Sequence, residues 1–365
     1  MSIKDKLQII LITYNRFHHV KKTFEQFILA DNSPIKNFDI LVLDNNSTDN
    51  TKNYITQIMT YHSNVKYSKN KYNLGISGNI AKAMETADKE YLWIICDDDI
   101  YDWSNWDEIE KAIENNTEII CAARYAIPET NINQPEYQLL QLTFVPAIII
   151  KTSVFNDTNM RNSFDNIFTL FPHLFPVVSC INKNTTIYVV TKAIVNNGMN
   201  FKNTDCSYIR GVQSNDLCQR TRTMTWITGY ANVCSMIQNE KLKHKSMLCA
   251  INFIHGNFAK FCKNMHALYF EKKNWFQIID VSSQLDLISK IRLFFSLFRR
   301  HFVGACTEND HFVIRLLLFK IKFKIKKYIE DDYIVIDFNF MKFKKHVEKK
   351  YILLSIFNRE FKIRK

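Results

Sequence analysis

Short apolar runs alternate with amphipathic stretches through the first hundred residues of the chain. The apolar runs end at polar residues and are short enough for strands; they are residues 7–12, 39–43, 65–67 and 91–96. Between them, apolar residues recur at helical spacing, most clearly over residues 17–28 and 79–87. This alternation predicts an α/β fold with a mostly parallel sheet and flanking helices.

The pattern is less regular beyond about residue 125. We expect strands within residues 139–150, interrupted at Pro146, and within residues 185–193. We expect loops over residues 196–215 and helical structure over residues 242–276. The change in pattern divides the chain into three expected parts, which are residues 1–125, 126–240 and 241–365.

The basic residues concentrate at the end of the chain. Residues 290–365 contain 19 Lys or Arg against 8 Asp or Glu, so they carry most of the formal net charge of +12. Around residues 314–326, apolar and lysine positions fit either a strand with one basic face or an amphipathic helix. We expect a basic helical or mixed extension. Two interpretations stay open: contact with an anionic membrane surface, or a solvated basic face.

Composition narrows the class of protein. With 365 residues and 47% hydrophobic positions, the chain can bury a large core. Nine cysteines form no Cys-x-x-Cys pair, which favours free thiols in a reducing compartment over a disulfide framework or a zinc site. We find no secretory leader and no run of eighteen apolar residues, so we expect a cytoplasmic protein. Its basic extension would then face the cytoplasmic side of the inner membrane.

A polar segment follows each of the four expected strands. Ligands of open parallel sheets bind at the carboxyl ends of the strands, so these segments should meet in one crevice. The segments are Thr13-Tyr14-Asn15-Arg16, Asp44 to Asp49, Asn73-Leu74-Gly75 with Gly78-Asn79, and Asp97-Asp98-Asp99. Three adjacent carboxylates repel one another, and a divalent cation bound to a diphosphate would stabilise them. Taken alone, they would also fit a solvated acidic turn; the other three segments favour the cation site.

These four segments, in this order, resemble the family 2 glycosyltransferases, which have the GT-A fold. The resemblance covers residues 7–100 and implies transfer of a sugar from a nucleotide-sugar, UDP-linked above all, with Mn²⁺ or Mg²⁺. It implies that Thr13 and Tyr14 line the nucleobase pocket and that Asp44 accepts a hydrogen bond from the base. Asp97 would face the ribose and Asp99 would bind the metal, with Asp97 as the second metal ligand. The remaining donor-site residues are Asn15, Arg16, Asn73, Gly75, Asn79 and Asp98.

Several of these residues have a structural alternative. Asp44 fits an Asx turn, and Gly75 fits a tight turn. We also expect Ser47 or Thr48 to cap the helix that follows the second strand.

Inverting sugar transfer requires a general base that deprotonates the acceptor hydroxyl. We expect this base from the second part of the chain, with Asp165 preferred and Asp157 and His173 as rivals. The structural alternatives are that Asp165 caps a short helix and that His173 packs in a turn. The chain lacks the Glu-Asp pair of the family at this point.

The leading hypothesis is therefore a glycosyltransferase acting on a glycan or lipid-linked glycan, as in bacterial surface polysaccharide synthesis. A nucleic-acid-binding protein would explain the basic extension and none of the four polar segments, so we expect no nucleic acid partner. Sugar nucleotidyltransferases have a Gly-rich, Arg-containing first loop. The segment Thr13-Tyr14-Asn15-Arg16 lacks this pattern. A catalytically inactive scaffold is disfavoured by the intact aspartates.

Overall fold

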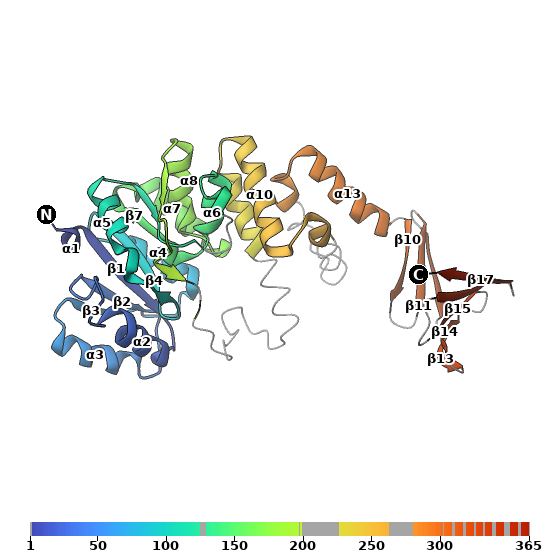
Figure 1. Cartoon of the computed structure of the whole chain (residues 1–365), viewed down its shortest axis with the longest axis horizontal. Helices are drawn as coiled ribbons and strands as arrows, with labels where there is room; N and C mark the ends of the chain where they lie inside the picture. The colour runs from blue at the N-terminus through green and yellow to red at the C-terminus, as the bar shows by residue number, and fades with distance from the viewer. Residues whose placement is uncertain are drawn as a thin grey trace. The chain divides into compact units, whose positions relative to one another are not determined.

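The computed structural model describes residues 2–124, 129–196, 198, 226–262 and 280–301, and most of residues 303–364 as strands (Figure 1). Side chains are described up to residue 294. The chain forms two compact units, residues 1–261 with 273–286, and residues 262–272 with 287–365. Each unit is described by itself. The expected division near residues 125 and 240 stays a prediction.

The first unit contains a seven-stranded sheet in the order β3-β2-β1-β4-β7-β6-β8. All neighbours pair in parallel except β7, which is antiparallel to both β4 and β6. This confirms the predicted mostly parallel sheet. The strands are β1 (Leu7–Thr13), β2 (Ile40–Asp44), β3 (Val65–Lys69), β4 (Tyr91–Cys96), β6 (Ile119–Cys121), β7 (Ile148–Lys151) and β8 (Ile187–Val189). A second, two-stranded sheet pairs β5 (Ile100–Tyr101) with β9 (Val195–Asn196).

Helices flank this sheet (Figure 1). Helix α2 packs on α3, and α4 packs on β1, β4 and α7. The helices are α1 (Ile3–Lys6), α2 (Phe17–Thr23) with a π-helical continuation η1 (Phe24–Ile28), α3 (Thr51–Tyr61), α4 (Gly75–Glu85), α5 (Trp106–Glu114), α6 (Pro135–Gln141), α7 (Asp157–Asp165), α8 (Leu174–Asn182) and α10 (Glu240–His255). Short 3-10 turns are η2 (Trp103–Asn105), η3 (Glu129–Asn131), η4 (Val145–Ala147), η5 (Thr152–Val154) and η6 (Ile167–Thr169).

The central strands are covered on both faces, as their uninterrupted apolar sequences require. Every residue of β1 is buried, and so are the first five residues of β4. Trp93 of β4 is fully buried, stacks on Trp106 and donates a hydrogen bond from its indole nitrogen to the carbonyl oxygen of Pro146 at 2.8 Å. Trp103 packs edge-on against both rings. These tryptophans therefore form part of the core under the end of β4.

The predicted strands within residues 139–150 are only partly right. Residues Pro135–Gln141 form helix α6, and only Ile148–Lys151 is a strand. Proline is favoured in the first turn of a helix, and a short apolar run does not distinguish a strand from a buried helix. Leu139 and Leu140 are buried on α6, which packs against α10. Within residues 185–193 only β8 is a strand, and most of the loop expected over residues 196–215 lies outside the described residues.

The second unit resolves the two interpretations of residues 314–326 in favour of strands. After α13 (Leu287–His301) come two antiparallel sheets, one of three strands and one of five. The strands are β10 (Val303–Glu308), β11 (His311–Leu316), β12 (Phe319–Lys324), β13 (Lys326–Glu330), β14 (Tyr333–Asp337), β15 (Met341–His346), β16 (Tyr351–Ile356) and β17 (Arg359–Arg364). Register pairs Ile314 with Ile321 and Arg315 with Lys320, so apolar and basic positions alternate together. Among the described helices, none combines the length and apolarity that a membrane crossing requires.

Candidate active site

Register brings the four polar segments to one edge of the sheet. Thr13 at the end of β1 lies opposite Asp44 at the end of β2, and Asp44 lies opposite Lys69 at the end of β3. On the other side, Ile12 lies opposite Cys96, the last residue of β4. The carboxyl ends of four parallel strands therefore lie side by side, as a ligand crevice in an α/β sheet requires.

Asp97 is held by groups from the first segment. Its carboxylate accepts hydrogen bonds from the Thr13 hydroxyl at 2.5 Å and from Nη1 of Arg16 at 3.0 Å. Its backbone carbonyl accepts another from the Thr23 hydroxyl at 2.8 Å. Burial raises the pKa of Asp97 to about 6, although Arg16 opposes this rise. Asp97 is thus fixed in place by α2 and the residue that ends β1.

Asp99 is the least compensated acid of the site. It is 2% exposed, and among the described residues none is a hydrogen-bond partner of its Oδ2. Its Oδ1 accepts a 3.3 Å bond from the backbone nitrogen of Gly198. Burial raises the pKa of Asp99 to about 8, and the adjacent Asp98 carboxylate adds to the rise. A buried carboxylate oxygen without a partner is unfavourable unless a cation completes it.

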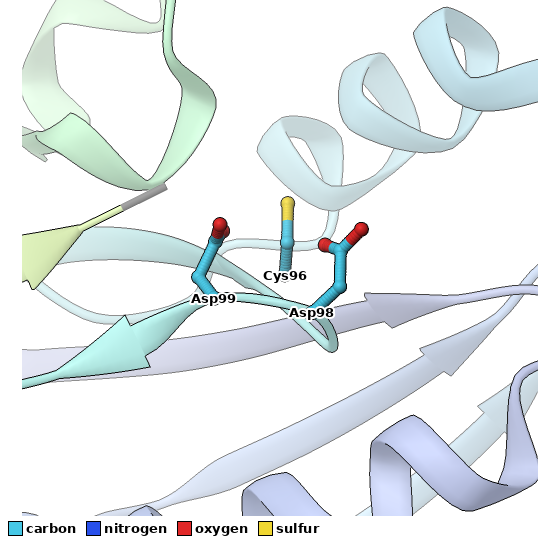
Figure 2. A group of neighbouring side chains, drawn as sticks. All are labelled: Cys96, Asp98 and Asp99. Atoms are coloured by element: carbon cyan, nitrogen blue, oxygen red, sulfur yellow. The ribbon is translucent and has the colours of Figure 1, made fainter. Parts of the chain in front are cut away.

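The geometry groups Asp99 with Asp98 and Cys96 (Figure 2). One ligand atom from each of the three lies within 4.8 Å of the others, and Figure 2 shows the three side chains directed to the same side of the loop. The two carboxylates supply the oxygen ligands that Mg²⁺ and Mn²⁺ prefer. Burial raises the pKa of the Cys96 thiol well above its ordinary value, so this group stays protonated and does not suit a hard cation. Asp98 and Asp99 therefore fit a divalent cation. The sequence-based expectation that Asp97 is a metal ligand together with Asp99 stays a prediction.

Asp44 already has protein partners for both oxygens. Oδ1 accepts the backbone N–H of Ser47 at 2.7 Å, and Oδ2 accepts the Tyr67 hydroxyl at 2.5 Å. The residue is fully buried. The bond to Ser47 corresponds to the turn-forming role that the sequence analysis gave as the structural alternative for Asp44. The nucleobase role stays a prediction.

The first two segments are joined to each other. Asn15 has a left-handed φ of 50°, its backbone nitrogen donates to the Ser47 hydroxyl at 2.8 Å, and its side-chain oxygen accepts the Thr48 N–H at 2.7 Å. The expectation that Ser47 or Thr48 caps α3 is wrong, because the cap position is Asn50 and no side chain caps there. Ser47 and Thr48 instead tie the second segment to Asn15.

Four asparagines connect the second and third segments. Asn45 donates to Asn73 Oδ1 at 2.8 Å and to the Gly75 carbonyl at 3.1 Å, and its own oxygen accepts from Asn70 at 3.1 Å and from the Leu74 backbone at 2.8 Å. Asn70 also donates to Asn79 at 2.8 Å. Asn73 and Asn79 therefore act within a polar network. Asn45 belongs to the second polar segment but had no role assigned from the sequence, and Asn70, three residues before the third segment, was missed.

Gly75 is required by backbone conformation. Its φ is +71°, and a Cβ at this position would meet no atom within 4 Å, so conformation rather than space disfavours residues other than glycine. Gly78 differs, since a Cβ there would lie 2.9 Å from Leu74 Cβ. Tyr14, expected in the nucleobase pocket, is half-buried at the same edge of the sheet.

The three candidate bases lie in different surroundings. Asp157 begins α7 and Asp165 ends it, and both are exposed. Asp165 therefore does not precede and cap a helix over residues 166–170, where only the short turn η6 forms. His173 is buried, lies with Nε2 3.2 Å from the Leu142 carbonyl oxygen, and has a pKa lowered by burial to about 4. At neutral pH this imidazole is uncharged and a weak proton acceptor.

The second half of the unit reaches back to the aspartates. Strand β9 pairs with β5, which follows Asp99 directly, and the Asp102 N–H donates to the Ile194 carbonyl at 2.8 Å. Lys192 forms an ion pair with Asp102 at 3.2 Å. The loop of three aspartates is thus held from one side by α2 and from the other by residues 192–196 and Gly198.

The solved structures that are similar to this chain include two of S. aureus TarS. The crystal structure of S. aureus TarS has a TM-score of 0.51 at 12% identity and covers 98% of this chain and 77% of that one. TarS 1–349 has a TM-score of 0.50 at 14% identity, with 87% and 98% coverage. At these identities the likeness concerns the fold. A mostly parallel sheet with flanking helices and an acidic loop at its carboxyl edge defines the GT-A class of glycosyltransferase folds.

Sequence comparison points to a family. Residues 8–184, slightly less than half of the chain, match the family model described as glycosyl transferase family 2, so this part of the chain is similar to that family. A GalNAc(5)-diNAcBac-PP-undecaprenol beta-1,3-glucosyltransferase of Campylobacter jejuni is 30% identical over 95 residues, 26% of this chain and 30% of that protein. An uncharacterized glycosyltransferase of Mycoplasma genitalium is 28% identical over 102 residues, 28% and 34% of the two chains. The matched part spans about one third of each relative.

We expect Asn45→Ala to lower the free energy of unfolding by about 2–4 kcal/mol. The substitution removes four side-chain hydrogen bonds of the buried Asn45 to exposed or half-buried partners, and each such bond contributes about 0.5–1.5 kcal/mol. Urea unfolding measures the change. Asn53→Ala, which removes one exposed bond to Asn50, is the control and should stay within about 0.5 kcal/mol. Equal effects of the two substitutions would contradict a structural role for the network.

His173 predicts a loss of stability in acid. Its pKa in the folded protein, about 4, lies below the ordinary value of 6.5, so the unfolded chain takes up the proton first. The contribution of His173 to the free energy of unfolding is complete above pH 6.5. It falls by about 2–3 kcal/mol between pH 7 and pH 4.5. His173→Gln should remove that part of the acid loss in urea unfolding, whereas the exposed His18→Gln should not. An unchanged acid profile in His173→Gln would show that another group controls it.

Proposed function

We propose that this protein is a metal-dependent, inverting glycosyltransferase that moves a sugar from a UDP-linked donor to a hydroxyl of a glycan or lipid-linked glycan. The observation that carries the proposal is the buried Oδ2 of Asp99, which has no hydrogen-bond partner in the described part of the chain and lies beside Asp98, at the edge where four polar segments meet. The family supports the reaction class. An acceptor carried on a lipid diphosphate is supported by the name of the Campylobacter jejuni relative, whose likeness covers 95 residues. We propose bacterial surface polysaccharide synthesis as the setting, on the resemblance of residues 7–100 to the family.

The residues of the chain divide the work as follows. Asp98 and Asp99 would hold Mn²⁺ or Mg²⁺, which as a Lewis acid stabilises the charge that develops on a departing nucleoside diphosphate. Tyr14 and Thr13 would lie against the nucleobase end of the donor, with Asp44 as the hydrogen-bond acceptor. The asparagine network around Asn73, Gly75 and Asn79 keeps the third segment in place, so the donor meets a prearranged surface.

Transfer of the sugar requires a general base close to the hydroxyl that receives the sugar. The acceptor hydroxyl loses its proton to the base as its oxygen bonds to the anomeric carbon, while the bond from that carbon to the diphosphate oxygen breaks. Asp165 is our preferred base and Asp157 the alternative, since both carboxylates are exposed. His173 is the weakest candidate because it is buried and its pKa is lowered to about 4.

We further propose that α13 contacts an anionic membrane surface. Four apolar residues at helical spacing are exposed on this helix: Leu287 at 71%, Ile288 at 65%, Ile291 at 45% and Phe294 at 61%. Lys290 and Arg292 interleave with them in the sequence, and residues 290–365 carry most of the net positive charge. An exposed apolar stripe next to basic residues suits the boundary between lipid headgroups and acyl chains. Such contact would bring the enzyme to a lipid-linked acceptor.

Asp99→Asn tests the reaction. Family 2 enzymes often hydrolyse their donor slowly, so nucleotide release can be followed for UDP-, GDP- and dTDP-sugars with Mn²⁺, Mg²⁺ or EDTA and without an acceptor. We expect metal-dependent release from one donor and a loss of about 100-fold or more in Asp99→Asn. The metal-free variant should be at least as stable to heat as the wild type, because the amide removes a buried, uncompensated carboxylate.

The exposed Asp107→Asn is the matched control and should keep full release. Equal release in EDTA, or in Asp99→Asn, would disprove the metal role. Consumption of the UDP-sugar only when pyrophosphate is added would favour the nucleotidyltransferase alternative.

The membrane contact is tested with vesicles. The full chain should float with vesicles of phosphatidylglycerol and phosphatidylcholine and not with phosphatidylcholine alone, and added salt should weaken the binding. The double variant Ile291→Gln/Phe294→Gln should bind about tenfold or more weakly, from the loss of apolar transfer energy. Tyr61→Gln/Tyr72→Gln, which changes two exposed aromatic residues of the first unit, is the matched control. Equal flotation of both double variants would refute a role for α13.

A further inference from the structure

Arg16 forms two ion pairs within the loop of three aspartates. Its Nη1 lies 3.0 Å from Oδ1 of Asp97 and 2.7 Å from Oδ2 of Asp98. A single guanidinium nitrogen thus bridges carboxylates of two consecutive residues. These bonds are charge-assisted and partly buried, which makes them stronger than surface ion pairs.

The two acids that Arg16 bridges differ in their other partners. Asp97 also accepts the Thr13 hydroxyl and is anchored through Thr23. Asp98 is partly exposed and belongs with Asp99 to the carboxylate group that fits a divalent cation. Arg16 and a metal ion therefore require the same carboxylate.

Arg16 is placed for this contact by rigid neighbours. The residue before it, Asn15, is fixed in a left-handed conformation by bonds to Ser47 and Thr48. The residue after it, Phe17, donates its backbone N–H to Asp49 at 2.8 Å. A guanidinium is charged at every relevant pH and can pair with a carboxylate or with a phosphate.

We propose that Arg16 is the protein's own counter-cation for the aspartates, and that metal and nucleoside diphosphate displace it together. The metal takes Asp98, and the released guanidinium turns to the diphosphate while keeping its bond to Asp97. This inference rests on the proposed function, since it assumes that the aspartates take a divalent cation with a nucleoside diphosphate. It follows that metal alone binds weakly, because an ion pair must break. Metal and nucleotide bind cooperatively, because the diphosphate gives Arg16 a new partner.

Mn²⁺ binding to the full-length protein tests this without any measurement of transfer. The free Mn²⁺ signal in electron paramagnetic resonance gives the Kd with and without UDP. In the wild type, UDP should tighten Mn²⁺ binding about tenfold or more. Arg16→Gln should bind Mn²⁺ alone at least fivefold more tightly than the wild type and should gain less than threefold from UDP. Lys22→Gln, which removes one positive charge from the same helix, should stay within twofold of the wild type in both states.

The outcomes separate the two hypotheses. Mn²⁺ binding that Asp99→Asn abolishes, but that is equal or weaker in Arg16→Gln, would overturn the role of Arg16 and leave the metal site intact. Mn²⁺ binding that is absent, or unchanged in Asp99→Asn, would overturn both. An equal gain in Lys22→Gln would assign the effect to net charge and overturn the displacement. Arg16→Met serves as a second variant and must shift in the same direction as Arg16→Gln, which guards against a local folding defect.

Discussion

The placement of three consecutive carboxylates at the end of a buried strand is the constraint on which the rest of the site depends. The neighbours of this loop compensate part of its negative charge or fix part of its backbone. Thr13 and Arg16 donate hydrogen bonds to the Asp97 carboxylate, and Thr23 donates one to the Asp97 carbonyl oxygen. The backbone N–H of Gly198 donates one to Asp99. What these groups leave unsatisfied is one oxygen of Asp99. A protein that retains such an oxygen gives up stability at this point, which is the usual condition of a site prepared for a charged ligand.

The donor side of the crevice is rigid for a reason other than hydrophobic packing. Its loops are joined by side-chain amides and hydroxyls, with Asn15 linking the first two segments and Asn45 the second and third. Left-handed conformations at Asn15, Asn46 and Gly75 make the turns tight enough for these bonds. Asparagine suits this task because it tolerates such backbone angles and offers both a donor and an acceptor.

The sequence predicted the sheet through β4 because each strand is an apolar run that ends at a polar residue, and both signals are local. It also located the aspartates and the residues that face them. The prediction failed where one local pattern is compatible with both a strand and a helix. Leu139 and Leu140 were expected in a strand, but they are buried on helix α6, which packs against α10. It also gave no account of which partner Ser47 or Asn45 would choose, because those bonds join residues about thirty positions apart. The general base stayed undecided for the same reason, since no short-range pattern marks it.

The connection between β5 and β9 makes the position of Asp99 depend on a distant part of the sequence. Val195 and Asn196 pair with the strand that directly follows Asp99, and the Gly198 N–H donates to Asp99 from 99 positions away in the chain. An insertion close to either strand of this short bridge would therefore move Asp99, although it lies far from the acidic loop in the sequence.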